Sequence, residues 1–435
     1  MKGIIVISGL LVTGCSDNSS QSQTDNSSQS QTDNLSWSGT KQLGTSSSVW
    51  VGGITSDASG NVYVTAYTYG SLDNNSNAGR SDVFVVKYNN TGVKQWTQQL
   101  GTSNHEDAAG ITSDSSGNVY VTGSTYGGLD NNTDAEGTDT FLVKYDESGV
   151  KQWTRQLRTS TVDTTTAITS DSRGNVYVTG YRDGSYDNIS NFGCCQLFLI
   201  KYDEFGVEQW NQQILNSQSF GFDTTCDSSG NVYVTGYVLS ILDNNTNAGG
   251  ADAFVMKYNE SGVKQWTQQF GTSTNDYANG ITSDPSGNVY VTGYTDGSLN
   301  NTNAGENDAF VIKYNESGVK QWTQQFGTST DDYGNGITSD SSGNVYVTGH
   351  TDGSLDNNSN VGGYDAFVVK YDSSGVKQWT RQFGTSTTDV GREVAHDSGG
   401  NLYISGHTDG SLDGNSNAGG SDVFVVKYDS SGVKQ

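Results

Sequence analysis

Four ten-residue loops rich in Asp and Asn carry side chains of the kind that bind metal ions. Oxygen-bearing side chains occupy positions 1, 3, 5 and 10 of each loop: Asp73, Asn75, Asn77 and Asp82; Asp243, Asn245, Asn247 and Asp252; Asp356, Asn358, Asn360 and Asp365; Asp413, Asn415, Asn417 and Asp422. Ligands at this spacing suit a hard cation such as Ca²⁺. The same residues also form ordinary turns, because Asn, Asp and Gly tolerate left-handed backbone. We favour the turn and keep Ca²⁺ as a candidate cofactor, since Asn replaces most of the carboxylates.

Three charged residues interrupt an internal repeat at positions where most copies carry small side chains. Asp223 and Glu393 stand at the position that Gly or Ala fills in the other five copies, and Arg392 precedes Glu393. Such groups around one opening could bind a ligand, or could serve as acid and base in an enzyme. Drift of the repeat is the alternative interpretation, and it is the one we favour.

Other reactive residues give weaker signals. His350 and His407 replace a Tyr of the repeat, so they are expected at equivalent strand positions in neighbouring units. They could form a metal-binding pair, but we favour the alternative that both are half-buried substitutions for the Tyr. Cys194, Cys195 and Cys226 could form a disulfide, but the expected strand positions make a bridge to Cys226 doubtful. The chain contains no nucleophile elbow, phosphate-binding loop or zinc motif, so no catalytic residue is assigned.

These residues sit on a repeat that occurs seven times. Its core is Gly-Asn, then Val or Leu, then Tyr, and the Asn recurs every 56 or 57 residues: Asn61, Asn118, Asn175, Asn231, Asn288, Asn344 and Asn401. The sixth copy predicts strands at 335–339, 344–351, 366–371 and 376–383, linked by Gly-containing turns. Four strands in a unit of this length predict an all-β fold, a seven-bladed β-propeller with four-stranded antiparallel blades.

The two ends of the repeat region predict how the ring closes. The chain stops at Gln435, where a fourth strand should begin, and residues 40–46 match the missing piece, as comparison with 97–103 shows. The N-terminal strand is therefore expected to complete the last blade, which removes open sheet edges. In each blade, a Trp on the fourth strand is expected to wedge adjacent blades together.

The repeat resembles a known family. Gly-Asn-Val-Tyr-Val-Thr-Gly-Tyr-Thr, followed by Asp-Ala-Phe-Val-Val-Lys-Tyr-Asp-Ser-Ser-Gly-Val-Lys-Gln-Trp, is similar to the SBBP repeat of bacterial secreted and surface propellers, over residues 37–435. The resemblance implies fold and location, and no single activity. The Asp/Asn loops resemble the Asp-x-Asp-x-Asp-Gly loops of other calcium-binding propellers, but Gly falls at position 7 instead of 6.

The N-terminus carries a targeting signal. A basic start and the apolar run 3–12 fit a secretion signal, and Leu11 to Cys15 resembles the bacterial lipobox, which implies a signal peptide at 1–14 and a lipid on Cys15. An ordinary signal peptide with an incidental Cys is the alternative. Residues 15–36 are expected to form a lipidated tether rich in Ser, Gln and Asn, ahead of the propeller at 37–435. Ser16 favours the outer membrane over the inner.

The net charge of the chain limits the kinds of partner that it can bind. The formal net charge of −25 excludes nucleic acid, since an acidic surface repels phosphate. We therefore expect a monomeric, lipid-anchored protein of the bacterial cell envelope that binds another protein or a glycan without catalysis. The alternatives are an envelope enzyme, a lyase or glycan hydrolase, with its site at the channel mouth, and a calcium-dependent structural surface protein.

Overall fold

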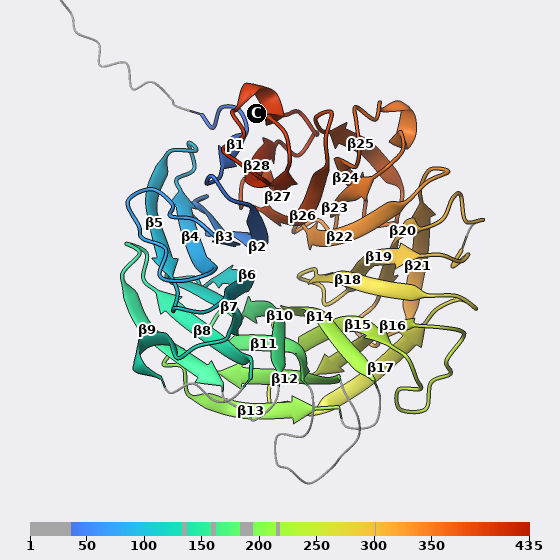
Figure 1. Ribbon diagram of the computed structural model, residues 1–435. Helices are drawn as coiled ribbons and strands as arrows, with labels where there is room; N and C mark the ends of the chain where they lie inside the picture. Colours follow the sequence, from blue (N-terminus) through green and yellow to red (C-terminus); the bar gives the residue numbers. More distant parts are fainter. Residues whose placement is uncertain (1–35, 133–136, 158–161, 183–194, 215–217, 301) are drawn as a thin grey trace, which may run out of the picture. The chain divides into compact units, whose positions relative to one another are not determined.

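A closed ring of seven four-stranded antiparallel sheets forms the fold, as the sequence predicts (Figure 1). The computed structural model describes residues 36–132, 137–157, 162–182, 195–214, 218–300 and 302–435. The chain divides into residues 1–35 and 36–435, and the first unit lies outside the described residues. Within the described part, no helix has the length and apolar content needed to cross a bilayer.

Each blade is a consecutive run of strands. Blades 1 to 3 contain β2 Val49–Ser56, β3 Val62–Thr68, β4 Asp82–Tyr88 and β5 Lys94–Leu100; β6 Glu106–Ser113, β7 Val119–Thr125, β8 Asp139–Tyr145 and β9 Lys151–Leu157; β10 Asp163–Ser170, β11 Val176–Arg182, β12 Gln196–Tyr202 and β13 Glu208–Gln213. Blades 4 and 5 contain β14 Ser219–Cys226, β15 Val232–Val238, β16 Asp252–Tyr258 and β17 Lys264–Phe270; β18 Asp276–Ser283, β19 Val289–Thr295, β20 Asp308–Tyr314 and β21 Lys320–Phe326. Blades 6 and 7 contain β22 Asp332–Ser339, β23 Val345–Thr351, β24 Asp365–Tyr371 and β25 Lys377–Phe383; β26 Asp389–His396, β27 Leu402–Thr408, β28 Asp422–Tyr428 and β1 Lys41–Leu43. Short 3₁₀ turns follow the second strand in blades 2, 6 and 7: η1 Leu129–Asn131, η2 Leu355–Asn357 and η3 Leu412–Gly414.

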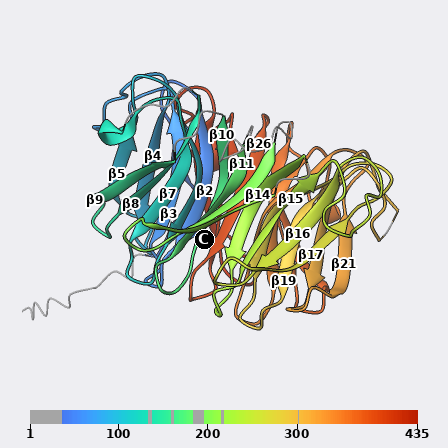
Figure 2. The same cartoon turned by 90° about the horizontal axis from the view of Figure 1, so that it is seen from below.

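The first strand of each blade lies innermost, where successive first strands contact one another around the axis (Figures 1 and 2). The prediction for the sixth copy is right within one residue for its last three strands. The first strand is longer than predicted, because β22 begins at Asp332 and continues through a bulge between Gly334 and Gly336. This bulge recurs in the first strand of every blade. The extra residue shifts the register, so the residues before the bulge do not continue the alternation of inward and outward side chains by which a strand is predicted.

Both chain ends contribute to the fourth strand of blade 7. β1 pairs with β28 through Lys41↔Val425 and Leu43↔Val423, while Lys434 forms an isolated bridge to Tyr428. The amide of Gly39 donates to the carbonyl of Gln435 at 3.1 Å, which joins the two segments. The predicted closure is therefore confirmed, with the strand assembled from two pieces.

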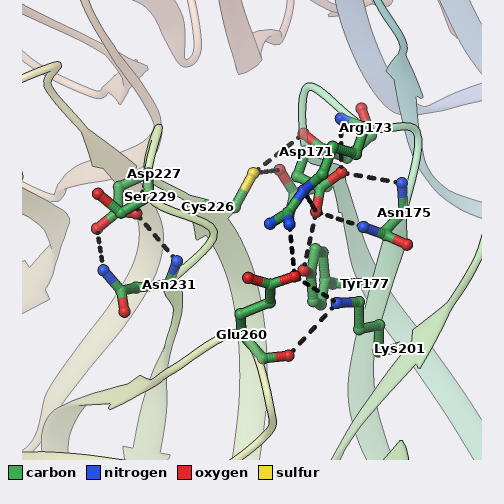
Figure 3. A network of polar contacts seen from close by, with 12 residues as sticks. Asp171, Arg173, Asn175, Tyr177, Lys201, Cys226, Asp227, Ser229, Asn231 and Glu260 are labelled. Carbon is green, nitrogen blue, oxygen red and sulfur yellow. Dashed lines mark hydrogen bonds and ion pairs between the residues drawn. The ribbon is translucent and has the colours of Figure 1, made fainter. Parts of the chain in front are cut away.

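A carboxylate network holds the turn between the first and second strands of each blade. In blade 6, Asp340 accepts hydrogen bonds from the amides of Ser342 and Asn344, from Asn344 Nδ2 at 2.7 Å and from the Tyr346 hydroxyl at 3.0 Å. The Asp, Asn and Tyr recur in all seven copies (Figure 3 shows two of them, at Asp171 and Asp227). This network explains why the repeat is centred on Gly-Asn-Val-Tyr.

Lys and Trp side chains join each blade to the next. Lys201 and Trp210 of blade 3 both donate to the backbone carbonyl of Glu260 in blade 4, at 3.3 and 3.0 Å (Figure 3 shows the lysine contact). Each Trp ring also covers a Gly of the next blade that has positive φ, so a Cβ at Gly262 would stand 2.8 Å from the ring of Trp210. The Trp wedge is thus confirmed, and Trp37 takes the seventh place by covering Gly92.

Candidate functional site

The divergent residues of the inner strands line a cavity at one mouth of the central channel. Its volume is about 550 Å³, which falls within the range of small-ligand sites. Its walls differ in character. Blades 4 to 6 contribute Phe222, Tyr294, Tyr333 and His350, whereas blades 1 to 3 contribute Val51, Gly52, Ala108, Ala109, Thr165 and Thr166. The channel mouth therefore has an aromatic half and a small-residue half.

A smaller cavity of about 120 Å³ adjoins the first, since the two share Gly52, Phe222 and Glu393 among their lining residues. Asp223 lines this inner space together with Glu393. Asp223 accepts hydrogen bonds from the amides of Thr224 at 2.7 Å and of Ile281, in the next blade, at 2.8 Å. The structure thus brings Asp223 and Glu393 to one space, although they lie 170 residues apart in the sequence.

The two carboxyl groups differ from ordinary acids. Burial raises the pKa of Asp223 to about 7, against the hydrogen bonds that it accepts. Burial, and then the nearby charge of Asp223, raises the pKa of Glu393 well above its usual value, and the Arg392 guanidinium only partly offsets this. Arg392 itself is exposed at the mouth. The inner space therefore holds two carboxyl groups that keep their protons to higher pH than ordinary acids, beneath a solvated cation.

His350 and His407 occupy equivalent strand positions in adjacent blades, as predicted. Burial, with the charge of Arg392 as the next cause, lowers the pKa of His350 to about 3 and that of His407 to about 4. His350 stacks on Tyr333, and its Nδ1 accepts a hydrogen bond from Asn335 Nδ2 at 3.0 Å, while His407 meets Trp50 edge-on. Both rings are neutral, and their contacts are those of packed aromatic side chains. Among the described residues, no cluster of three or more His, Cys, Asp or Glu side chains is arranged to hold a metal ion.

A continuous arc of aromatic rings runs over blades 3 to 6 on the first and second strands. Within blades 4, 5 and 6, cross-strand pairs stack with centroids 4.6 to 4.9 Å apart: Phe220 with Tyr237, Tyr277 with Tyr294, and Tyr333 with His350. Between blades, Tyr237 meets Tyr277 and Tyr294 meets Tyr333 edge-on, at 4.8 and 4.7 Å. Tyr181 extends the arc into blade 3 by contact with Phe220. Stacked and edge-on contacts are the two favourable geometries for aromatic pairs.

This arc was not predicted from the sequence. A signal for it exists, because copies 4, 5 and 6 each carry an aromatic residue at both of two positions that face one another across the first pair of strands. The extra three residues of the first strand contain one of these positions, so the strand bounds had to be known before the pairing could be seen.

The Asp/Asn loops fold against the outer edge of their own blades. The first Asp of each loop has left-handed backbone, and its carboxylate contacts a Lys and a Thr of the fourth strand; in blade 1, Asp73 lies 2.6 Å from Lys94 Nζ and accepts from Thr97 at 2.5 Å. The equivalent contacts are Asp243 with Lys264 and Thr267, Asp356 with Lys377 and Thr380, Asp413 with Lys434 and Thr40, and, in a loop that the sequence pattern missed, Asp130 with Lys151 and Thr154.

The remaining loop positions have other partners. The Asn at position 3 donates to a Leu carbonyl, the Asn at position 5 accepts from a Gly amide, and the closing Asp accepts from a loop amide and from a fourth-strand Gln: Asn75, Asn77 and Asp82; Asn245, Asn247 and Asp252; Asn358, Asn360 and Asp365; Asn415, Asn417 and Asp422. These contacts make each loop a hydrogen-bonded cover for the outer strand, which is an exposed sheet edge. Calcium binding within a loop stays a prediction.

The cysteines bear out the doubt about a bridge. Cys195 and Cys226 are not bonded to each other, and Cys194 lies outside the described residues. Cys226 contacts blade 3, where its thiol lies 3.0 Å from the carbonyl of Ser170, and burial raises the pKa of this thiol to about 12. A thiol with so high a pKa is a poor nucleophile at neutral pH. Cys15 also lies outside the described residues, so its lipidation stays a prediction.

Comparison with known proteins identifies the repeat. The family model of the SBBP β-propeller repeat matches six segments, at residues 39–73, 95–130, 152–187, 265–300, 321–356 and 378–413. The chain is built from SBBP β-propeller repeats. Each matched segment begins at or near the fourth strand of one blade and ends in the loop after the second strand of the next. Each therefore contains the Asp-Asn-Tyr network and the innermost strand, and five of the six also contain the fourth-strand Trp.

Two curated proteins match this chain at low identity. An uncharacterized WD repeat-containing protein of Acanthamoeba polyphaga mimivirus is 25% identical over 76% of this chain and 31% of its own length. The regulatory protein FlaEY of Caulobacter vibrioides is 25% identical over 75% of this chain and 39% of its own length. The chain thus spans about a third of the length of these curated relatives. The β-propeller domain of the Trilobed protease from Pyrococcus furiosus superposes with a TM-score of 0.51 at 8% identity, over 90% of this chain and 96% of that domain, which shows the fold alone.

Proposed function

We propose that this SBBP-repeat protein is a lipid-anchored, non-enzymatic binding scaffold of the bacterial cell envelope, and that the channel mouth captures a glycan. The observation that carries the proposal is the aromatic arc beside the cavity. Blades 4 to 6 line the cavity with aromatic rings, whereas blades 1 to 3 line it with small residues, and the packing of a sevenfold repeat does not require this difference. Blade 1 also carries aromatic residues at the stacking positions, Trp50 and Tyr67, but they do not line the cavity. The asymmetry therefore supports a surface shaped for one bound partner.

The chemistry of the mouth suits a sugar ring. Tyr side chains combine an apolar ring with a hydroxyl that hydrogen-bonds, and a sugar likewise has an apolar face and a polar edge. Tyr294 and Tyr333 line the cavity, and Asn279 and Asn335 add amide groups to its wall. Arg392 is an exposed cation in a chain with a net charge of −25, so it favours an acidic or neutral saccharide over a basic ligand.

A glycan array, followed by calorimetry on the best ligands, tests this function. Replacing Tyr294 or Tyr333 by Ala should weaken binding by about fivefold, because one ring contact is worth about 1 kcal/mol. The matched control is Tyr126→Ala, which removes a Tyr of the same face that is 47% exposed and does not line the cavity. Binding to no glycan, together with loss of a captured protein in the Tyr294 and Tyr333 variants, would replace the glycan by a protein partner.

The lipid anchor has its own test. Growth with labelled fatty acid should label the wild-type chain, whereas Cys15→Ala should carry no label and should leave the membrane fraction. A labelled Cys15→Ala chain would contradict lipidation at this residue.

One observation favours a second function. Asp223 and Glu393 share an enclosed space and have raised pKa values, as acids and bases in enzymes often do. An envelope hydrolase or lyase would use Glu393 as the proton donor at the channel mouth. Turnover of a bound glycan by the wild-type chain, lost in Glu393→Gln while binding persists, would establish catalysis in place of simple capture.

A further inference from the structure

The seven junctions between blades share one backbone arrangement but differ in two side chains. At each junction, the backbone amide of the first residue in a first strand donates to a carbonyl of the preceding blade. The acceptor is always the residue just before the third strand of that blade. The seven pairs are Val49 to Ser421, Glu106 to Ser81, Asp163 to Thr138, Ser219 to Cys195, Asp276 to Ala251, Asp332 to Asn307 and Asp389 to Tyr364. This hydrogen bond is 2.7 to 3.0 Å long throughout. Differences in charge at these junctions therefore come from the side chains alone.

Three consecutive junctions bury two aspartates each, whereas the junction between blades 1 and 2 buries Asp82 with a glutamate, Glu106, whose two oxygens accept from Thr102 and Thr125. The pairs are Asp252 with Asp276 between blades 4 and 5, Asp308 with Asp332 between blades 5 and 6, and Asp365 with Asp389 between blades 6 and 7. All six side chains are at most 1% exposed. The two carboxylates of a pair converge over a glycine, since a Cβ added at Gly271 would stand 2.6 Å from Asp252 Oδ1 and 2.8 Å from Asp276 Oδ2. At Gly327 and Gly384 a Cβ would also stand within 3.1 Å of both carboxylates.

One oxygen of each third-strand aspartate lacks a protein partner at these junctions. Asp252 Oδ2 accepts from the amide of Ala248 and from Gln269, both at 2.9 Å, but Asp252 Oδ1 accepts no hydrogen bond from the described residues. Asp308 Oδ1 and Asp365 Oδ1 are orphaned in the same way. A buried carboxylate oxygen without a partner is costly, and a second carboxylate beside it adds repulsion. Burial, and secondarily the charge of Asp252, raises the pKa of Asp276.

The junction between blades 2 and 3 has aspartates at the same two positions, but their charge is neutralised in a different way. There, Asp163 forms an ion pair with Arg182, whose Nε lies 3.5 Å from Asp163 Oδ1 and whose side chain is wholly buried. Arg182 is the register partner of Asp163, and Thr295, Thr351 and Thr408 are the register partners of Asp276, Asp332 and Asp389. One copy of the repeat therefore supplies a cation from its own chain at the position where five other copies have a Thr.

We propose that each of these three junctions binds one hard divalent cation, for which Ca²⁺ is the best fit, between the paired carboxylates. Two carboxylates balance a charge of +2, and Thr hydroxyls and backbone carbonyls offer the further oxygens that Ca²⁺ accepts in irregular geometry. The site differs from a loop site. It uses the closing carboxylates Asp252 and Asp365 of two loops, but the second carboxylate comes from the next blade and not from the start of the same loop. A cation in this position ties adjacent blades together.

Calorimetry of the full-length chain, freed of metal by a chelator, tests the proposal. Titration with CaCl₂ should show three equivalents bound per chain, and Ca²⁺ should raise the melting temperature by several degrees. The triple variant Asp276→Asn, Asp332→Asn, Asp389→Asn should lose both effects. The matched control is Asp243→Asn, Asp356→Asn, Asp413→Asn, which removes the opening carboxylates of three loops and mimics Asn300, the natural residue in blade 5. The control should keep all three equivalents.

A single substitution copies the natural precedent. Thr351→Arg, which imitates Arg182, should reduce the stoichiometry from three to two, as should Asp332→Asn, so the proposal stays testable if the triple variant does not fold. No heat and no thermal shift with Ca²⁺ or Mg²⁺ would overturn the proposal and would leave a shared proton as the means of neutralisation. Loss of binding in the loop control, with retention in the junction variant, would move the ion to the loops.

Discussion

The turn networks and the channel mouth are built on the same repeat and obey opposite rules. In all seven turn networks the Asn Nδ2 lies 2.7 or 2.8 Å from its Asp, and the Tyr hydroxyl lies 2.9 to 3.1 Å from it. At the mouth, the residues that precede and occupy the small-residue position change from Gly-Gly in blade 1 to Phe222-Asp223 in blade 4 and Arg392-Glu393 in blade 7. The residues that recur in every copy stabilise the blades and their packing, whereas these residues that differ between copies lie around the channel.

The difference has an energetic basis. A turn network must satisfy its buried polar groups, so any copy that lost one member of the network would leave another unpaired. A residue at the channel mouth faces solvent on one side and can change without breaking a network. A substitution in a turn network should therefore lower the free energy of unfolding more than a substitution at the channel mouth, even where the side chain removed at the mouth is larger or also charged.

The largest effect is expected from opening the ring. Deleting residues 37–46 removes β1 and Trp37, and it exposes the edge of β28 and the glycine at position 92. Each blade of a propeller contacts only its neighbours, so the whole ring depends on this last junction. We expect the melting temperature, followed by circular dichroism, to fall further than in any single substitution described here. Deleting residues 16–32 is the control and should leave the melting temperature unchanged; an equal fall in both deletions would mean that closure contributes little.

A smaller but still large loss should follow from Asp340→Ala. Its carboxylate accepts four hydrogen bonds, and its removal leaves Asn344 and Tyr346 without their acceptor. The free energy of unfolding should fall by about 3 kcal/mol in urea denaturation. Arg392→Ala removes a larger charged side chain from the mouth and should change the same quantity by no more than about 0.5 kcal/mol. Similar losses in the two variants would contradict the contrast between the regions.

The repeated part of the molecule was predictable from the sequence, and the reason is physical. The Gly-Asn-Val-Tyr core and the following Trp occur at fixed spacing because each serves the same contact in every blade, so counting them gives the number of blades and the closure. Strand bounds were right where alternation is regular and failed at the bulged first strand. The positions of Asp223, Arg392 and Glu393 near the axis also followed from alignment with the small residues of other copies.

The non-repeated part could not be read in the same way. The stacking of Tyr294 against Tyr277 and Tyr333 depends on register across a bulge and on the distance between blades, neither of which the sequence states. The pairing of Asp252 with Asp276 crosses a junction and joins the first residue of a third strand to the first residue of the next blade's first strand. Read along the chain, Asp252 looks like the end of a loop motif, and only the ring places it beside the next blade.

The Trp wedge can be separated from the strain of a positive φ. Gly318 and Gly414 both have φ of +78°. A Cβ at Gly318 would stand 2.8 Å from the ring of Trp266, whereas a Cβ at Gly414 would have no atom within 4 Å. Both Gly→Ala changes impose left-handed backbone on Ala, at about 1 kcal/mol. Gly318→Ala must also displace the Trp266 ring, so its unfolding free energy should fall by about 1–2 kcal/mol more than that of Gly414→Ala. Equal losses would show that the ring adapts without cost and that the wedge is not a tight contact.

The smallest effect is a difference in pH dependence between the two regions. Burial holds the pKa of Asp223 at about 7, above its unfolded value, so below about pH 4 it is protonated in both states, and its contribution to stability is lost as pH rises from 4 to 7. Asp340 behaves in the opposite way. Although burial opposes the shift, hydrogen bonds led by that of Asn344 lower its pKa, so its contribution appears as pH rises through 4 and disappears in acid.

Urea denaturation of the wild type, Asp223→Asn and Asp340→Asn at pH 4 and pH 7.5 measures both slopes. On going from pH 4 to pH 7.5, the wild type should lose about 1 kcal/mol relative to Asp223→Asn, since water in the channel screens the charge, and should gain stability relative to Asp340→Asn. Glu393 interacts with Asp223, so the first comparison is repeated in a Glu393→Gln background, where the relative loss should shrink because the repulsion between the two carboxyl groups is removed. If stability changed with pH in the same direction for both aspartates, the channel mouth would stabilise a charged carboxylate as well as the hydrogen-bonded turns do. The distinction between the two regions would then depend on packing alone.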